Sequence, residues 1–192
     1  MSSALFSYSD LTTLDEFEHF QQKISQLAQV MGIDLMKYEI DHLAVRVNSD
    51  KNVKNWLALL MKFGTILSDN IVNDRRIYLI QLNEPLILLG KSVDIVELPF
   101  PKNKCYPLES WEHIEIVIPF EEDESVSQWL SRLEKKFLWN KLTTLSVKVS
   151  VPKVDGERLP NPSIAVSFAD KSENSVCIKV HPYNIKNIIE VW

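Results

Sequence analysis

Hydrophobic positions along the chain follow two spacings, one typical of helices and one typical of strands. Apolar residues recur every three or four positions over residues 13–31, 49–63 and about 121–137, and again in a short segment after Asn184. Strand-like runs lie between these helices, at roughly 40–47, 65–72, 76–82, 86–89, 93–98, 112–118, 144–150, 163–168 and 175–181. Nearly all prolines fall between or at the ends of these runs, as strand boundaries require. The pattern predicts an α+β protein.

Polar residues mark the expected ends of the helices. Thr13 and Glu16 fit a capping box for the first helix, and Gly32 is placed to end it. Ser49 can cap the second helix. The third helix is predicted to begin at about Glu121, because the acidic run 121–124 would complement the positive end of a helix dipole.

The order strand, helix, several strands occurs twice. Residues 41–47 and 112–118 open the two units, and both read acid, histidine, then alternation. Each unit closes on a side chain able to bind metal just before a proline, Glu97 in the first and His181 in the second. We therefore expect two βαβββ-type modules that form one curved mixed sheet, a cup with helices on its outer face, plus an N-terminal helix. The predicted single domain, 1–192, divides into the helix (1–35), a first module (36–104) and a second module (105–192).

One face of this sheet is predicted to be apolar and the other to carry chemistry. Side chains alternate along a strand, so the second face holds three histidines with several charged residues: His42, Arg46, Glu97, His113, Glu115, Lys179 and His181. Imidazole and carboxylate are the usual ligands of divalent zinc, iron, nickel and manganese. A single strand histidine is more often packed than ligating, but here both halves carry equivalent residue types at equivalent positions. A divalent transition metal of unspecified identity is therefore the expected cofactor.

Composition narrows the setting. The net charge of −5 argues against a nucleic-acid partner, and the four glycines are too far apart for a glycine-rich phosphate loop. Two cysteines without a CxxC motif are typical of a reducing compartment. Neither a signal-like segment nor an apolar run of membrane-spanning length is present. We expect a cytoplasmic protein with a small-molecule ligand and no membrane partner; the sequence leaves its oligomeric state open and allows a monomer.

Several segments resemble known proteins. The paired modules look like the vicinal oxygen chelate superfamily, which includes glyoxalase I and the extradiol dioxygenases. More closely, the chain resembles the YecM-like family of bacterial proteins in these segments: 41–46, 95–99, 111–117 (WEHIEIV), 157–162 (ERLPNP) and 179–182. The resemblance implies a metal in the cup held by the first and last strand of each module, which gives His42, Glu97, His113 and His181. Superfamily enzymes usually have a carboxylate where this chain has His181.

The resemblance also implies metal-assisted chemistry on a molecule that chelates the metal through oxygen atoms. Glu115 is the predicted general base, since it lies two residues beyond His113 on the same face; a salt bridge to Arg46 or Lys179 is the alternative. Arg46, Arg158 and Lys179 are predicted to bind the substrate. Arg75 is a further candidate, although it lies where a solvated turn is expected.

The sequence is consistent with more than one kind of site and function. If His181 does not ligate, His42, Glu97 and His113 form a facial triad of the kind found in non-haem iron oxygenases. Zinc or nickel would favour an isomerase or lyase, and ferrous iron a dioxygenase. A small-molecule binding protein without catalysis, or one in which the metal only stabilises the fold, is also consistent with the sequence.

Overall fold

The computed structural model describes residues 14–151 and 159–189. The helices are α2 (Leu14–Met31), α3 (Asp50–Leu60), α4 (Val126–Phe137) and α5 (Ile185–Ile189), with 3-10 turns η1 (Leu35–Lys37) and η2 (Trp139–Lys141). The strands are β1 (Glu39–Val45), β2 (Gly64–Val72), β3 (Arg75–Leu88), β4 (Lys91–Pro99), β5 (Trp111–Val117), β6 (Leu145–Ser150), β7 (Ser163–Phe168) and β8 (Cys177–His181). None of the helices in these ranges is both long and apolar enough to span a membrane.

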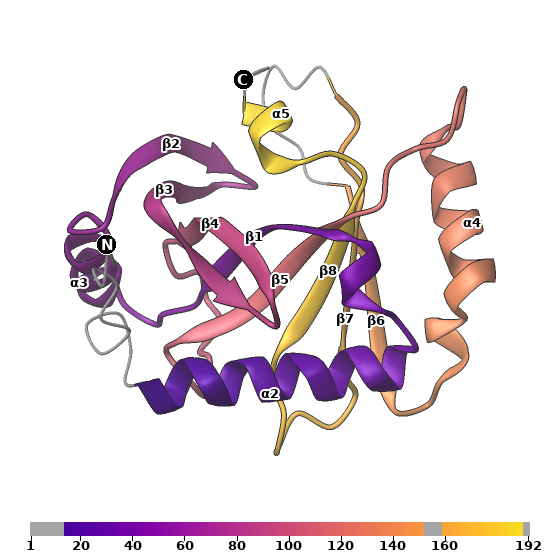
Figure 1. Ribbon diagram of the computed structural model, residues 1–192, viewed down its shortest axis with the longest axis horizontal. Coiled ribbons are helices and arrows are strands. Elements are labelled where there is room, and N and C mark those ends of the chain that lie inside the picture. Colours follow the sequence, from indigo (N-terminus) through magenta and orange to yellow (C-terminus); the bar gives the residue numbers. More distant parts are fainter. Residues whose placement is uncertain (1–13, 152–158, 190–192) are drawn as a thin grey trace.

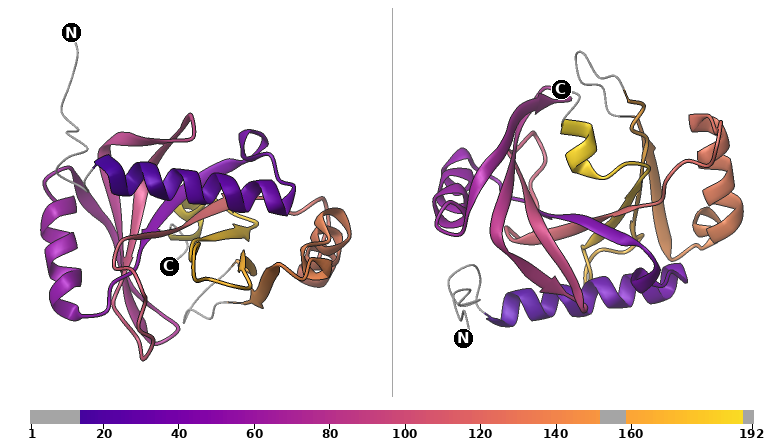
Figure 2. Two further views of the ribbon diagram at one scale, coloured as in Figure 1. Left: turned by 90° about the horizontal axis from the view of Figure 1, so that it is seen from below. Right: turned by 45° about the horizontal axis from the view of Figure 1, so that its top comes forward.

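The strands form one eight-stranded mixed sheet whose two halves repeat each other. Its order is β2-β3-β4-β1-β5-β8-β7-β6, so each module contributes its strands in the internal order 2-3-4-1. The first and last strands of each module pair in parallel, and β1 pairs with β5 antiparallel to join the halves. The sheet curves into a cup, with α3 and α4 on opposite flanks (Figures 1 and 2). The predicted α+β class with two βαβββ-type modules is confirmed.

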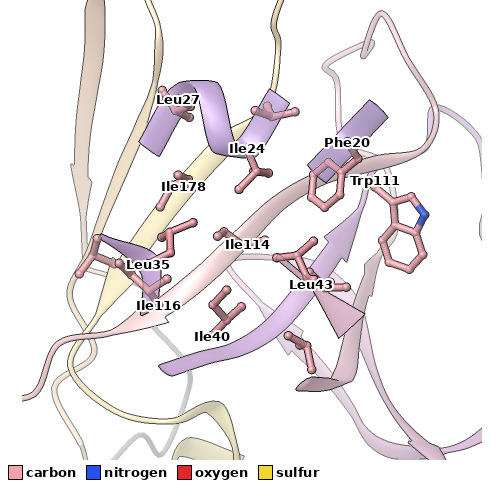
Figure 3. Packing of buried hydrophobic residues seen from close by; sticks show 14 of the residues in the cluster. Phe20, Ile24, Leu27, Leu35, Ile40, Leu43, Trp111, Ile114, Ile116 and Ile178 are labelled. Carbon is pink, nitrogen blue, oxygen red and sulfur yellow. The ribbon is translucent and has the colours of Figure 1, made fainter. Parts of the chain in front are cut away.

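The main core lies between α2 and the convex face of the central strands. Phe20, Ile24 and Leu27 are buried on the inner stripe of α2, as its three-to-four-residue spacing predicts. They pack over Ile114 and Ile178, among other strand residues (Figure 3). Fully burying a side chain of this size stabilises the fold by roughly 1.5–3 kcal/mol, so this face is fixed toward α2 and the opposite face lines the cup.

A bulge in β1 decides which side chains enter the cup. Ile40 pairs with Ile116 and His42 with Glu115, so Asp41 is one extra residue on β1. Ile40 and Leu43 consequently share the apolar core although they are three positions apart (Figure 3). The bulge lets Asp41 lie beside the ring of His42, which strict alternation would not allow.

The helix ends agree in part with the sequence. Gly32 has φ +65°, and the N–H of Ile33 donates to the carbonyl of Ala28, so α2 ends as predicted. Ser49 caps α3 by accepting from the N–H of Asn52 at 3.2 Å. The capping role predicted for Thr13 lies outside the described residues.

The predicted start of the third helix was wrong. α4 begins at Val126 behind a capping box made by Ser125 and Gln128, since the short cap side chain satisfies backbone groups that carboxylates further upstream cannot reach. Glu124 instead pairs with Arg132 at 2.7 Å.

Two further features differ from simple expectation. The runs 76–82 and 86–89 belong to one long strand, β3. The short helix α5 packs inside the cup (Figure 2). Its side chains Ile185 and Ile188 pack there against Leu79 and Ile95. These four apolar side chains close part of the concave face beside the polar residues.

Candidate metal centre

Strand register brings the chemical residues of distant segments into two adjacent rows on the concave face. One row crosses β1, β5 and β8 through His42, Glu115 and Lys179. The other crosses β4, β1 and β5 through Glu97, Ala44 and His113. The two rows lie next to each other on β1 and β5, at the centre of the sheet where the two modules join.

Four of these side chains converge. His42 Nε2 lies 3.7 Å from Glu97 Oε2 and 3.6 Å from Glu115 Oε1. His113 Nε2 lies 4.0 Å from Glu97 Oε1 and 3.4 Å from Glu115 Oε1. Neither Nε2 atom has a hydrogen-bond partner among the described residues, although both are buried. One ligand atom from each of the four residues lies within 4.8 Å of all the others.

These separations suit a shared metal ion better than direct hydrogen bonds. Zinc bonds to nitrogen and oxygen are about 2.0–2.2 Å long, so tetrahedral ligand atoms lie about 3.4 Å apart. The observed distances of 3.4–4.0 Å approach that spacing. Buried nitrogen atoms without a partner are rare in folded proteins, and an ion at this centre would satisfy both.

An acidic residue holds each of the two histidines from behind. Asp41 Oδ1 lies 3.0 Å from His42 Nδ1, and Glu112 accepts a hydrogen bond at His113 Nδ1. A carboxylate on Nδ1 fixes the tautomer that presents Nε2 as a lone pair, which is the usual support for a metal-bound histidine. Asp41 and Glu112 were not assigned this role from the sequence. The acid–histidine pair that opens both modules was the signal.

His181 lies in a second group rather than at the centre of the first. Its Nε2 is 2.8 Å from Asp41 Oδ2 and its Nδ1 is 3.5 Å from Glu115 Oε2. Asp41, His42 and His181 form a separate cluster of potential ligand atoms, with Asp41 between the two rings. The structure thus brings His42, Glu97 and His113 together with Glu115, and places His181 beside them.

The register explains this placement. Glu97 pairs with Ala44, two residues after His42. At the equivalent place in the second module, Lys179 pairs with Glu115, two residues after His113. Lys179 is therefore the counterpart of Glu97, and the carboxylate that β8 lacks is supplied from β5 by Glu115.

The other predicted site residues have distinct surroundings. Arg46 is buried behind the centre, 3.1 Å from Glu97 Oε1 and 3.6 Å from Glu112 Oε2. The ammonium group of Lys179 lies 3.1 Å from Glu115 Oε1. Arg158 lies outside the described residues.

The buried charges perturb one another. Burial by itself would raise the pKa of Asp41, but His181 and His42 lower it to about 2. Burial would lower the pKa of His42, but Asp41 and Glu115 outweigh it and raise that pKa well above its usual value. Burial is likewise outweighed at Glu115, where Lys179 and His42 hold the pKa of the carboxyl well below its usual range. Opposite charges therefore dominate desolvation throughout the cluster.

A cavity of about 340 Å³ opens from the centre into the cup. His42, Glu97, Glu115, Lys179 and His181 line its inner end. The volume is at the lower end of the range for small-molecule sites, about 300–1,000 Å³. Arg46 does not line it.

Comparison with known proteins identifies the family. The model of the family described as "YecM protein" matches residues 10–191, so the chain belongs to the YecM family and that resemblance is confirmed. An uncharacterized protein of Haemophilus influenzae is 62% identical over 170 residues, 88% of each chain. Protein YecM of Escherichia coli K12 is 34% identical over 174 residues, 91% of this chain and 89% of the relative. A solved structure described as protein EC4020, from structural genomics, has a TM-score of 0.75 at 32% identity, covering 92% of this chain and 88% of that one. These names state no activity.

Proposed function

We propose that this protein binds one divalent transition metal through His42, Glu97, His113 and Glu115 and acts, as a metalloenzyme of the vicinal oxygen chelate type, on a small molecule in the cup. One observation carries the proposal. Two buried Nε2 atoms that have no hydrogen-bond partner in the described part of the chain face two carboxylates at 3.4–4.0 Å, and a further carboxylate holds each ring at its Nδ1 atom.

The charge of the cluster supports a divalent cation. Four carboxylates and two permanent cations meet here: Asp41, Glu97, Glu112 and Glu115 against Arg46 and Lys179. With His42, His113 and His181 all neutral, two negative charges are left over. Uncompensated buried charge is costly. The surrounding carboxylates raise the pKa values of His42 and His181, so protons on these rings would offset the excess charge when no ion is bound. A divalent ion would take over that task.

Such an ion would act as a Lewis acid that stabilises negative charge on an oxygen atom of the bound molecule. Asp41 and Glu112 would hold the ligand rings in place, and Lys179 would fix Glu115. His181 lines the cavity, and its Nδ1 makes no hydrogen bond among the described residues; the same holds for its Nε2, although Asp41 Oδ2 lies 2.8 Å from that atom. Since Asp41 lies at its other nitrogen, Nδ1 is the atom at which His181 would exchange a proton with the bound molecule.

This assignment gives Glu115 the role of a ligand instead of the base predicted from sequence. Two imidazoles and two carboxylates would leave a divalent centre neutral, and oxygen donors of a bound molecule would have to add to these four ligands or replace one of them. Zinc or nickel in that site would indicate an isomerase or lyase, and ferrous iron an oxidoreductase.

Elemental analysis of protein purified without chelators tests the proposal. We expect about one zinc, nickel, iron or manganese per chain, or uptake of one on reconstitution. Glu115→Gln should lose most of it, His181→Gln should keep it, and Glu122→Gln, at an exposed position, is the matched control. If the wild-type protein neither carries nor takes up metal, the proposal fails. If the wild-type protein binds metal and Glu115→Gln binds the same amount, Glu115 is not a ligand. The role of general base predicted from the sequence then remains for it.

A further inference from the structure

We propose that the end of the cup away from the metal centre is an anion-binding site built by Arg75, Lys148 and Asn161, so that the ligand is an organic acid with a second anionic group. This inference rests on the proposed function for its other end, where the ligand's oxygen atoms would meet the metal. It names the class of molecule that the cavity accepts.

Strand register places these residues on the walls of the same cavity. Glu115 pairs with Lys179, Lys179 with Ala165, and Ala165 with Lys148, so Lys148 ends the row that begins at the metal centre. Three strand spacings correspond to about 14 Å along the sheet. Glu115, Lys179 and Ala165 lie inside the cup, and Lys148 is exposed at its rim.

Arg75 approaches from the other half of the sheet. It lies on β3 in the alternating set with Ile77 and Leu79, and Leu79 pairs with Glu97. Four residues along a strand span about 13 Å. The cavity is therefore bounded by one cation from each module, both at a similar distance from the centre.

The two cations at this end of the cavity differ from the two at the metal centre in having no acidic partner among the described residues. Within residues 14–151 and 159–189, neither Arg75 nor Lys148 has a carboxylate within 4.0 Å, whereas Arg46 and Lys179 are both paired. Arg75 Nε and Asn161 Oδ1 are buried atoms with no hydrogen-bond partner there. An anionic group would accept paired hydrogen bonds from the Arg75 guanidinium, and the Nδ2 group of Asn161 can donate a further one. Asn161 Oδ1 is itself an acceptor, so it does not bind the anion.

The space between the two polar ends is apolar. Ile77, Leu79, Ala165 and Ile185 form its walls. A fitting molecule thus has oxygen donors at one end, a short aliphatic middle, and a carboxylate or phosphate at the other end. Two cations that have no acidic partner within residues 14–151 and 159–189 favour such an anion over a neutral sugar or an amine.

The test is calorimetric titration of the zinc-loaded protein with 2-hydroxy acids of increasing length: malate, 2-hydroxyglutarate and 2-hydroxyadipate. The neutral-ended counterparts are 2-hydroxy acids of the same length that end in an isopropyl group. We expect one dicarboxylate to bind at least tenfold tighter than its counterpart. The analogue of 2-hydroxyglutarate with a distal phosphonate distinguishes a carboxylate from a phosphate at this end. The group that gives the higher affinity indicates which anion the site is built for.

Variants locate the effect. Arg75→Gln should lower the affinity for the preferred dianion by about 10–100-fold, in line with the loss of a charged hydrogen bond. Its affinity for the neutral-ended acids should be unchanged. Arg76→Gln is the matched control, because Arg76 is the neighbouring arginine and pairs with Asp69 at 2.6 Å, away from the cavity. Zinc content is measured on every variant.

The outcomes separate the two proposals. If zinc binds but the dianions show no preference, or Arg75→Gln has no effect, the anion site is refuted and the metal site is unaffected. If no zinc binds, the metal proposal fails; dianion binding to the metal-free protein that Arg75→Gln weakens would then still support the anion site.

Discussion

Asp41 offers the sharpest test of the site, because one carboxylate lies between His42 and His181. Asp41→Asn keeps the shape of the side chain and removes its charge. The residue is buried, with 3.0 Å to one ring and 2.8 Å to the other. Two separate losses follow, one in the stability of the metal-free protein and one in metal affinity.

The loss of stability can be worked from the pKa. The pKa of Asp41 falls from 3.8 to about 2 on folding, and one pKa unit corresponds to 1.36 kcal/mol, so the charge stabilises the metal-free fold by about 2 kcal/mol at pH 7. A lowered pKa gives stability that is fully present above 3.8 and disappears as the pH falls toward 2. The difference between wild type and Asp41→Asn should therefore shrink to roughly half at pH 3.

The loss of affinity follows from ring orientation. Removing a carboxylate that supports a ligating histidine typically lowers metal affinity 10–100-fold. Urea unfolding with a chelator at pH 7 and pH 3 measures the first effect, and zinc competition with a chromophoric chelator measures the second. Asp123→Asn, an exposed aspartate at positive φ that asparagine also tolerates, is the control. A zinc affinity changed less than threefold, or a stability loss equal at both pH values, would refute this account of Asp41.

Three further results are expected. The raised pKa values of His42 and His181 give stability that is present below pH 6.5 and is lost as the pH rises through them. The melting temperature with chelator should therefore fall from pH 6 to pH 9, while the increase in melting temperature on adding zinc should grow. An equal increase at pH 6 and pH 9 would show that His42 carries no proton in the metal-free state. Gly64→Ala should lower the free energy of unfolding in urea by about 1–3 kcal/mol, since a Cβ would lie 2.3 Å from the carbonyl oxygen of Gln81. An unchanged free energy of unfolding would mean that β2 and β3 can move apart at no cost. Ser125→Ala should cost about 1 kcal/mol and 2–4 °C in melting temperature through loss of the α4 cap, and an unchanged melting temperature would show that the cap is replaced by water.

Local periodicity explains why much of the fold could be predicted. The alternation around His42 and His113 assigned both to the face away from the helices, because successive strand residues point to opposite sides. The apolar stripe on α2 indicated that the opposite face of the sheet packs against a helix. The internal repeat then predicted two equivalent modules, and the sheet order confirms them.

The identity of the fourth potential ligand could not be read in this way. Both Glu115 and His181 lie on the correct face of their strands, and only the pairing between β5 and β8 shows that Lys179 takes the place equivalent to Glu97. The position of Asp41 depends on a bulge that no residue type announces.

The sequence by itself determined the class of fold, the two faces of the sheet and the residue types available for metal chemistry, since these follow from spacing along one chain. Tertiary structure alone decided which side chains meet, because register, bulges and the seating of α5 inside the cup are set by hydrogen bonds and packing between segments far apart in sequence. Arg75 and Lys148, 73 positions apart, share one cavity for that reason.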